Sequence, residues 1–168
     1  RRLAAIPALR RIRYTSPHPI FFDDDLVRAH GEIEKLCPHV HMPVQSGADP
    51  VLARMRRRYT GDHVRGLAAR LRAARPDLAL TTDLIVGFPG ESDADFEATL
   101  ALIRDVGYVD GFSFKYSPRP GTAGAEIAMT SFALGWTRRI VCVSANALSR
   151  SSSLGRMVAS VSPGCFSA

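Results

Sequence analysis

The segment that most constrains the fold is residues 79–86, ALTTDLIV, a nearly continuous apolar run that ends at Gly87. A run of this length followed by a turn residue is typical of a parallel strand that is buried on both faces. Three further strand-like segments, 11–15, 39–44 and 111–116, alternate with helical segments along the chain. This alternation predicts an α/β fold with parallel strands in one sheet and helices outside it.

The helical segments are predicted from apolar stripes and from capping residues. In the first, an apolar stripe runs from Leu26 to Cys37 behind three aspartates, which favour the positive end of a helix dipole. Proline or a small polar residue marks the start of each later helix. The predicted starts are Asp49 as the cap before Pro50, Thr60, and Ser92 with Asp95 as a capping box.

Ligands of open parallel sheets bind beyond the carboxyl ends of the strands. Four loops follow the predicted strands, at residues 16–19, 45–49, 87–91 and 117–122, and all are rich in small or polar side chains. Glycine permits close backbone approach to a ligand, and polar side chains supply hydrogen bonds. The residues of interest in these loops are Gly47, Gly87, Gly90, Gln45, Ser46, Glu91 and Arg119.

The charge of the chain suggests a partner. The sequence has 22 Lys and Arg against 16 Asp and Glu, and all but two of the basic residues are arginine. Because the arginine fork pairs with phosphates and stacks on bases, an RNA or nucleotide partner is a reasonable hypothesis. The alternative is that the charged runs are solvated faces of helices.

Other function classes are disfavoured by composition. No uncharged apolar run reaches the length of about 18 residues that a membrane span needs, so the cytoplasm is the expected compartment. The three cysteines are far apart and match no CxxC metal spacing. The histidines also lack the spacing of a metal site, although His39 and His41 are expected to share one strand face.

A change in composition divides the chain near residue 125. Residues 1–125 contain 15 of the 16 acidic residues and five serines, whereas residues 126–168 contain one acidic residue and nine serines. The second part also lacks a helix or strand period. We therefore expect one folded unit over 1–125 and an irregular tail over 126–168, either low in complexity or the product of a frameshift. An ordered accessory segment is the alternative.

Four motifs in order carry a resemblance to a known family. RIRYTSPHP, LCPHVHMPVQSGADPVLARMRRRYT, LTTDLIVGFPGES and FSFKYSPRPGT together resemble the second half of the radical S-adenosylmethionine core of methylthiotransferases. The similarity is greatest to tRNA enzymes of the MiaB type, and weaker to the enzymes that modify a ribosomal protein. Several motifs in the correct order are far more specific than a single glycine-rich loop.

The resemblance implies a fold, cofactors and a substrate. It implies a partial (β/α) barrel that binds a 4Fe-4S cluster through a CxxxCxxC loop and cleaves S-adenosylmethionine reductively. The family inserts sulfur and a methyl group into an isopentenylated adenosine beside the anticodon of tRNA. Because this sequence has no CxxxCxxC, the resemblance supplies no cluster ligand and no catalytic residue here. The 168-residue chain alone is predicted to be inactive, with an N-terminal half of the enzyme as a possible partner.

Site residues follow from the resemblance, loop by loop. Those predicted to contact S-adenosylmethionine lie at the carboxyl ends of the strands: Ser16, Gln45, Ser46, Gly47, Asp83, Ile85, Val86, Gly87, Gly90 and Glu91. Those predicted to contact the substrate RNA form a basic cluster with an aromatic, or follow the last strand: Arg54, Arg56, Arg57, Arg58, Tyr59, Tyr116 and Arg119. The alternative to an enzyme is a nonenzymatic nucleotide- or RNA-binding remnant, or a segment of a ribosomal-protein methylthiotransferase.

Overall fold

The computed structural model describes residues 1–15, 17–122 and 124–125, so Ser16 and the predicted tail, 126–168, lie outside it. Within this part of the chain, no helix is long and apolar enough to cross a bilayer. The elements, in chain order, are a 3-10 helix Pro19–Phe21, α1 Asp24–Glu32, β1 His39–His41, α2 Asp49–Arg54, α3 Gly61–Ala74, β2 Ala79–Val86, α4 Asp93–Val106 and β3 Asp110–Lys115.

The three strands form one parallel sheet in the order β1-β2-β3. The predicted α/β class and the predicted bounds of the central strand are confirmed. In the register of the sheet, His41 lies opposite Thr81, and Phe112 lies opposite Asp83. Pairing of β1 is interrupted after His41 and resumes at a bridge between Gln45 and Leu84; between them the Thr82 hydroxyl accepts from Val44 N and donates to the Met42 carbonyl.

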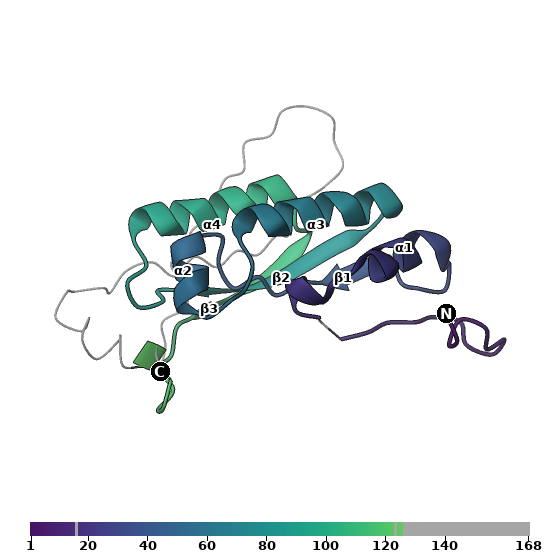
Figure 1. The fold of residues 1–168 in the computed structure, drawn as a ribbon, viewed down its shortest axis with the longest axis horizontal. Helices are drawn as coiled ribbons and strands as arrows, with labels where there is room; N and C mark the ends of the chain where they lie inside the picture. Colours follow the sequence, from purple (N-terminus) through teal and green to yellow (C-terminus); the bar gives the residue numbers. More distant parts are fainter. Residues whose placement is uncertain (16, 123, 126–168) are drawn as a thin grey trace, which may run out of the picture.

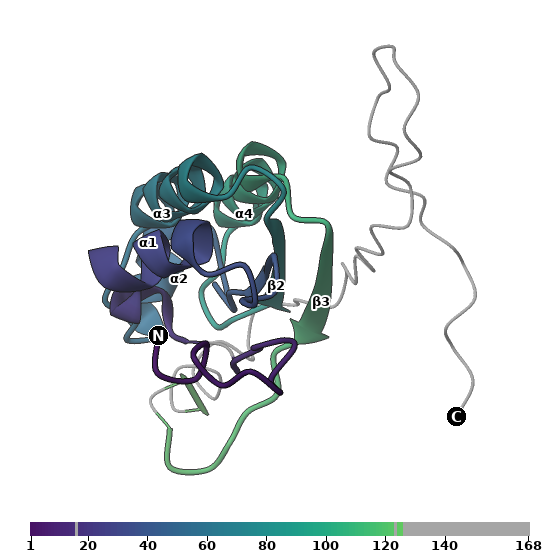
Figure 2. The same ribbon diagram turned by 90° about the vertical axis from the view of Figure 1, so that its right-hand side faces the viewer.

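The helices cover one face of the sheet. α3 and α4 lie along the same side of the strands, and α1 packs beside α3 (Figures 1 and 2). Along β2 the exposure alternates: Leu80 and Leu84 are buried under the helices, whereas Thr81, Asp83 and Ile85 are half-buried on the other face. The prediction that this strand is buried on both faces is therefore wrong within the described part of the chain.

The segment predicted as the first strand, residues 11–15, does not form a strand. Among the described residues, Ile12 alone of this segment pairs, in a single bridge to Leu36, and the segment is further held by a 2.5 Å hydrogen bond between the Tyr14 hydroxyl and His30 Nε2. Burial raises the pKa of Tyr14 to about 12, so the phenol stays protonated in this contact. Composition suggested a strand here, but strand formation depends on a paired neighbour that local sequence does not supply.

The predicted helix starts are confirmed at Thr60 and Ser92, and the start predicted at Asp49 is wrong. Thr60 caps α3 through His63 N at 3.2 Å, and Ser92 with Asp95 forms the predicted capping box of α4. Asp49 is not a cap, since α2 begins at Asp49 itself and its carboxylate accepts from Gly61 N at 2.8 Å. That contact ties the start of α2 to the start of α3. The first helix ends at Glu32, so Cys37 is not part of it.

The loop after β1 lies unusually close to α4. A Cβ at Gly47 would lie 2.6 Å from Thr99 Cα and 2.7 Å from the carbonyl oxygen of Ala98. The Thr99 hydroxyl accepts from Gly47 N at 2.9 Å and bonds the Ser46 hydroxyl at 3.2 Å. Glycine is thus required at residue 47 for the loop to reach the helix.

We predict opposite effects for two glycine-to-alanine substitutions. Gly47→Ala should lower the free energy of unfolding by about 1–3 kcal/mol or more, because the added methyl overlaps the backbone of α4. Gly66→Ala, in the exposed middle of α3 with no atom within 4 Å of its Cβ position, should raise it by about 0.5–1 kcal/mol. Urea unfolding of both variants tests this, and equal stabilities would contradict the close packing at Gly47.

Candidate functional site

The loops at the carboxyl ends of the strands meet at one end of the molecule. A small apolar cluster joins them, with Phe88 and Tyr116 packed edge to face at 5.0 Å between ring centroids. Ala48 and Val51 complete the buried part of this cluster. The structure therefore brings together loops 45–49 and 87–91 and the end of β3, as the strand-end rule predicts.

Gln45 occupies a special place in this group of loops. Its backbone is left-handed, with φ 67°, which is uncommon for a residue other than glycine. The backbone is held there by two hydrogen bonds to β2, Gln45 N to the Asp83 carbonyl at 2.9 Å and Ile85 N to the Gln45 carbonyl at 2.8 Å. Among the described residues no hydrogen bond engages its half-buried side-chain amide, which is free to meet a ligand.

Two other predicted contacts are used inside the fold. Ser46 is fully buried, and its hydroxyl bonds Thr99 and accepts from Ala48 N at 3.2 Å. Val86 is 8% exposed and belongs to the helix-facing side of β2. These residues shape the loop and the sheet, so any effect on a ligand passes through their neighbours.

Glu91 holds the turn that follows β2. One carboxylate oxygen accepts from Gly87 N at 2.6 Å and from Phe88 N at 3.3 Å, and the side chain is buried. Burial raises the pKa of Glu91, and the two backbone donors offset part of that rise. Gly87 and Gly90 both have positive φ in this turn. Nothing lies within 4 Å of a Cβ built on Gly87, which leaves room for close approach of a ligand.

Asp83 and Ile85 point away from the helices, on the open face of the sheet. They alternate with Leu84, which is buried under α3 and α4. Asp83 Oδ2 lies 3.2 Å from His41 Nε2. An apolar and an anionic side chain thus approach the loops from the open face, which suits a ligand with both a flat apolar part and a hydrogen-bond donor.

Sequence reasoning missed a polar row on this face. Arg13, His39, Thr81, His41 and Asp83 are joined in that order by side-chain contacts of 2.9–3.2 Å. The available signal was the alternation of polar residues at 39 and 41 and at 81 and 83. A neighbouring hollow of about 200 Å³ is lined by part of this row and by Phe112.

The basic cluster after α2 is divided between the fold and the surface. Arg54 donates to the Gly90 carbonyl at 2.9 Å and is only partly exposed. Tyr59 is buried and donates its hydroxyl to the Val44 carbonyl at 2.9 Å, so its ring is occupied by the core. Arg56 and Arg58 are exposed and Arg57 is half-buried, which leaves these three side chains for a phosphate partner.

The last two predicted RNA contacts follow β3. Tyr116 packs on Phe88, and its hydroxyl is buried without a hydrogen-bond partner among the described residues. Arg119 is exposed, and its carbonyl accepts from Thr122 N and from the Thr122 hydroxyl. The backbone of Arg119 therefore builds a turn, while its guanidinium remains on the surface.

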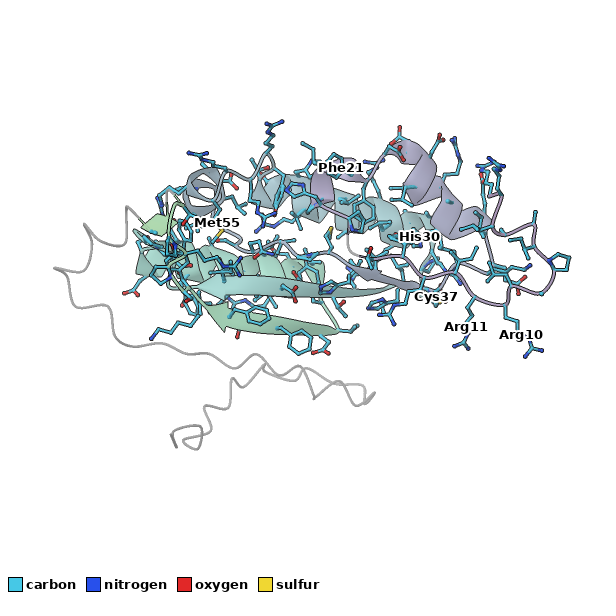
Figure 3. All side chains as sticks on the ribbon, turned by 90° about the horizontal axis from the view of Figure 1, so that it is seen from below. Arg10, Arg11, Phe21, His30, Cys37 and Met55 are labelled. Atoms are coloured by element: carbon cyan, nitrogen blue, oxygen red, sulfur yellow. The ribbon has the colours of Figure 1, made fainter. Side chains whose placement is uncertain are left out.

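The described part of the chain contains no group of three His, Cys, Asp or Glu residues that could hold a metal ion. Cys37 is half-buried and lies near α1, whereas Met55 marks the opposite end, where the loops meet (Figure 3). Cys142 and Cys165 lie outside the described residues. The donors present do not fit an iron–sulfur cluster, which thiolates hold.

Comparison with protein families and curated proteins gives a consistent result. The sequence model of the Radical SAM superfamily matches residues 1–103. Two proteins from strains of Cereibacter sphaeroides, each a tRNA-2-methylthio-N(6)-dimethylallyladenosine synthase, are 59% identical over 126 residues. The match covers 75% of this chain and 29% of each relative, so the chain spans less than a third of their length.

Comparison with solved structures supports the fold. Coproporphyrinogen III oxidase from Escherichia coli, described as a radical SAM enzyme, superposes with a TM-score of 0.55 at 18% identity. The superposition covers 67% of this chain and 25% of that chain. At this identity the likeness concerns the arrangement of strands and helices.

The buried Glu91 predicts a pH dependence of stability. A raised pKa means that the folded state holds its proton at pH values where the unfolded state has lost it, so stability contributed by this group falls as pH rises above the ordinary value. The stability of the unmodified chain relative to Glu91→Gln should therefore be greatest near about pH 4 and decrease toward about pH 7. Thermal melts over this range measure the difference.

Glu97→Gln serves as the control for that experiment. Glu97 is an exposed carboxylate on α4, so the variant reproduces the change in net charge without changing the turn. A difference between the unmodified chain and Glu91→Gln that grows with pH would contradict the assigned burial.

Proposed function

Because this chain belongs to the Radical SAM superfamily, we propose that it is part of a tRNA methylthiotransferase that acts on isopentenylated adenosine beside the anticodon. The observation that carries the proposal is 59% identity over 126 residues to two synthases of that name. The superfamily model matches residues 1–103, which include loops 45–49 and 87–91. The proposal also assigns residues 1–125 to the second half of the barrel and the chain to the cytoplasm.

In this proposal the open face and the strand-end loops bind S-adenosylmethionine. Ile85 contacts the flat apolar part of the cofactor, and the free amide of Gln45 meets its polar part. Gly87 permits close approach, since no atom lies near its Cβ position. Ser46, Gly47 and Glu91 hold the loops in place through the hydrogen bonds described above. In such enzymes an iron–sulfur cluster supplies the electron for cofactor cleavage, and the described part of this chain offers no ligand set for it.

Complementation tests the proposed function. The chain would be coexpressed with the preceding segment of a Cereibacter sphaeroides relative, which carries the cysteine loop in the family, in a host that lacks its own enzyme. Mass spectrometry of tRNA digests should detect 2-methylthio-modified adenosine only when both polypeptides are present. Product from the chain alone would contradict the predicted inactivity. No product from the pair, with both folded, would favour a nonenzymatic remnant.

Gln45→Gly supplies a matched variant for that experiment. A left-handed conformation costs a residue with a Cβ about 1–2 kcal/mol, so glycine relieves strain at this position while removing the amide. We expect a folded chain with product reduced by about tenfold or more, the usual effect of losing a positioning hydrogen bond of 1.4 kcal/mol. Unchanged product would exclude the Gln45 amide from the site. Iron and sulfide assays of the chain alone, purified without oxygen, should find no cluster.

The exposed arginines are proposed to contact tRNA phosphates. Substituting Arg56, Arg57 and Arg58 by Gln should weaken binding of an anticodon stem–loop RNA and reduce the slope of log affinity against log salt by about 2–3, from three lost phosphate contacts. The matched control replaces three exposed arginines on α1, α3 and α4, namely Arg28, Arg70 and Arg104. Equal slopes for the two triple variants would show that only net charge matters.

A further inference from the structure

The polar row on the open face consists of four consecutive hydrogen-bonded contacts. Arg13 Nη2 lies 3.2 Å from His39 Nδ1, and His39 Nε2 lies 3.1 Å from Thr81 Oγ1. The same hydroxyl lies 2.9 Å from His41 Nδ1, and His41 Nε2 lies 3.2 Å from Asp83 Oδ2. The row therefore begins at a group that only donates and ends at a group that only accepts.

With both imidazoles neutral, these contacts allow one arrangement of protons. Arg13 donates, so His39 Nδ1 must accept and the proton of His39 must be on Nε2. That proton is donated to the Thr81 oxygen, whose own proton is then donated to His41 Nδ1. His41 must carry its proton on Nε2 and donate it to the Asp83 carboxylate. Every N–H and O–H in the row thus points toward Asp83.

The surroundings of His39 support a neutral imidazole at the start of the row. Burial, the Arg13 charge and the neighbouring His41 all lower the pKa of His39. A protonated His39 would place an N–H against the guanidinium of Arg13, which also donates. The neutral form is therefore the one that satisfies both partners.

The end of the row leaves one oxygen available. Asp83 Oδ2 is engaged by His41, whereas no hydrogen bond to Oδ1 occurs within the described part of the chain. The Asp83 side chain is 27% exposed and lies opposite Phe112 across the β2–β3 pairing. Phe112 is itself 63% exposed. A fixed acceptor therefore lies beside a bare aromatic ring on the same face.

The chemistry of this pair defines a ligand class. A flat heteroaromatic group can pack on Phe112 and donate an N–H or O–H to Asp83, as a nucleoside does. Phe112 also lines the neighbouring hollow of about 200 Å³, together with Arg13, Thr81 and Asp110. This volume is smaller than the 300–1,000 Å³ typical of larger ligands and suits one ring system.

We propose that Arg13, His39, Thr81 and His41 are positioning residues that orient the Asp83 carboxylate to accept a hydrogen bond from an adenosine group packed on Phe112. The ligand class rests on the proposed function, since S-adenosylmethionine and the tRNA nucleoside both contain adenosine. The positioning row itself rests only on the contacts in this chain.

Histidine tautomers test the row directly. Long-range proton–nitrogen correlation NMR of the 168-residue chain, labelled in histidine and held near about pH 8, should show both His39 and His41 as the Nε2–H tautomer. Assignments come from His39→Gln and His41→Gln. An Nδ1–H tautomer or an imidazolium at either residue would overturn the row.

Two substitutions at the shared hydroxyl separate positioning from packing. Thr81→Val keeps the shape of the side chain but removes the hydroxyl, so the nitrogen chemical shifts of His39 Nε2 and His41 Nδ1, which bond that hydroxyl, should change, while Arg13 and Asp83 still favour the Nε2–H tautomers. Thr81→Ser keeps the hydroxyl and should preserve these chemical shifts. Backbone amide spectra confirm that both variants are folded. Identical histidine spectra in the valine and serine variants would contradict the role of Thr81.

Binding experiments with two adenosine sources then test the ligand. The probes are S-adenosylmethionine and a short oligoadenylate, titrated separately. Asp83→Asn and Thr81→Val should weaken whichever probe binds by about tenfold or more, while Thr81→Ser should not. A chain that binds neither probe, or whose affinity is unchanged in Asp83→Asn, overturns the ligand assignment. A failure of the proposed function gives a different result. The complementation experiment then yields no methylthio product, while the histidine tautomers and adenosine binding persist.

Discussion

Parallel pairing on both sides of β2 is the constraint on which the molecule depends. It directs the carboxyl ends of all three strands to one end, where loops 45–49 and 87–91 and Tyr116 pack together. It also divides β2 by alternation, so that Leu80 and Leu84 build the core while Asp83 and Ile85 face the open side. One strand therefore supplies both the stability of the sheet and the candidate site.

The candidate site depends on residues that never face a ligand. The Glu91 carboxylate closes the turn at Gly87, and the Thr99 hydroxyl holds the loop at Gly47 against α4. These contacts fix the backbone around Gln45 and Gly87. A ligand can then use the free side-chain amide of Gln45 and the open space at the Cβ position of Gly87. Rigid loops of this kind reduce the entropy that a ligand must overcome when it binds.

Local signals predicted much of the fold, and remote contacts explain where prediction failed. The bounds of β2 and the caps at Thr60 and Ser92 follow from neighbouring residues, and the structure confirms them. The ligand contacts predicted for Ser46 and Tyr59 stay predictions. The structure shows both side chains buried, with their hydroxyls bonded to Thr99 and to the Val44 carbonyl, and this burial is not visible in a local pattern.

The polar row illustrates a further limit, because its existence depends on strand register. The sequence indicated that His39 and His41 share a face, but their common partner Thr81 is 40 residues from His41 along the chain. It lies between them only because His41 pairs with Thr81 in the sheet. A shift of one residue would turn Thr81 toward the helices and separate both histidines from Asp83. The same shift would expose Leu80 and Leu84, so the packing of the core selects the register that assembles the row.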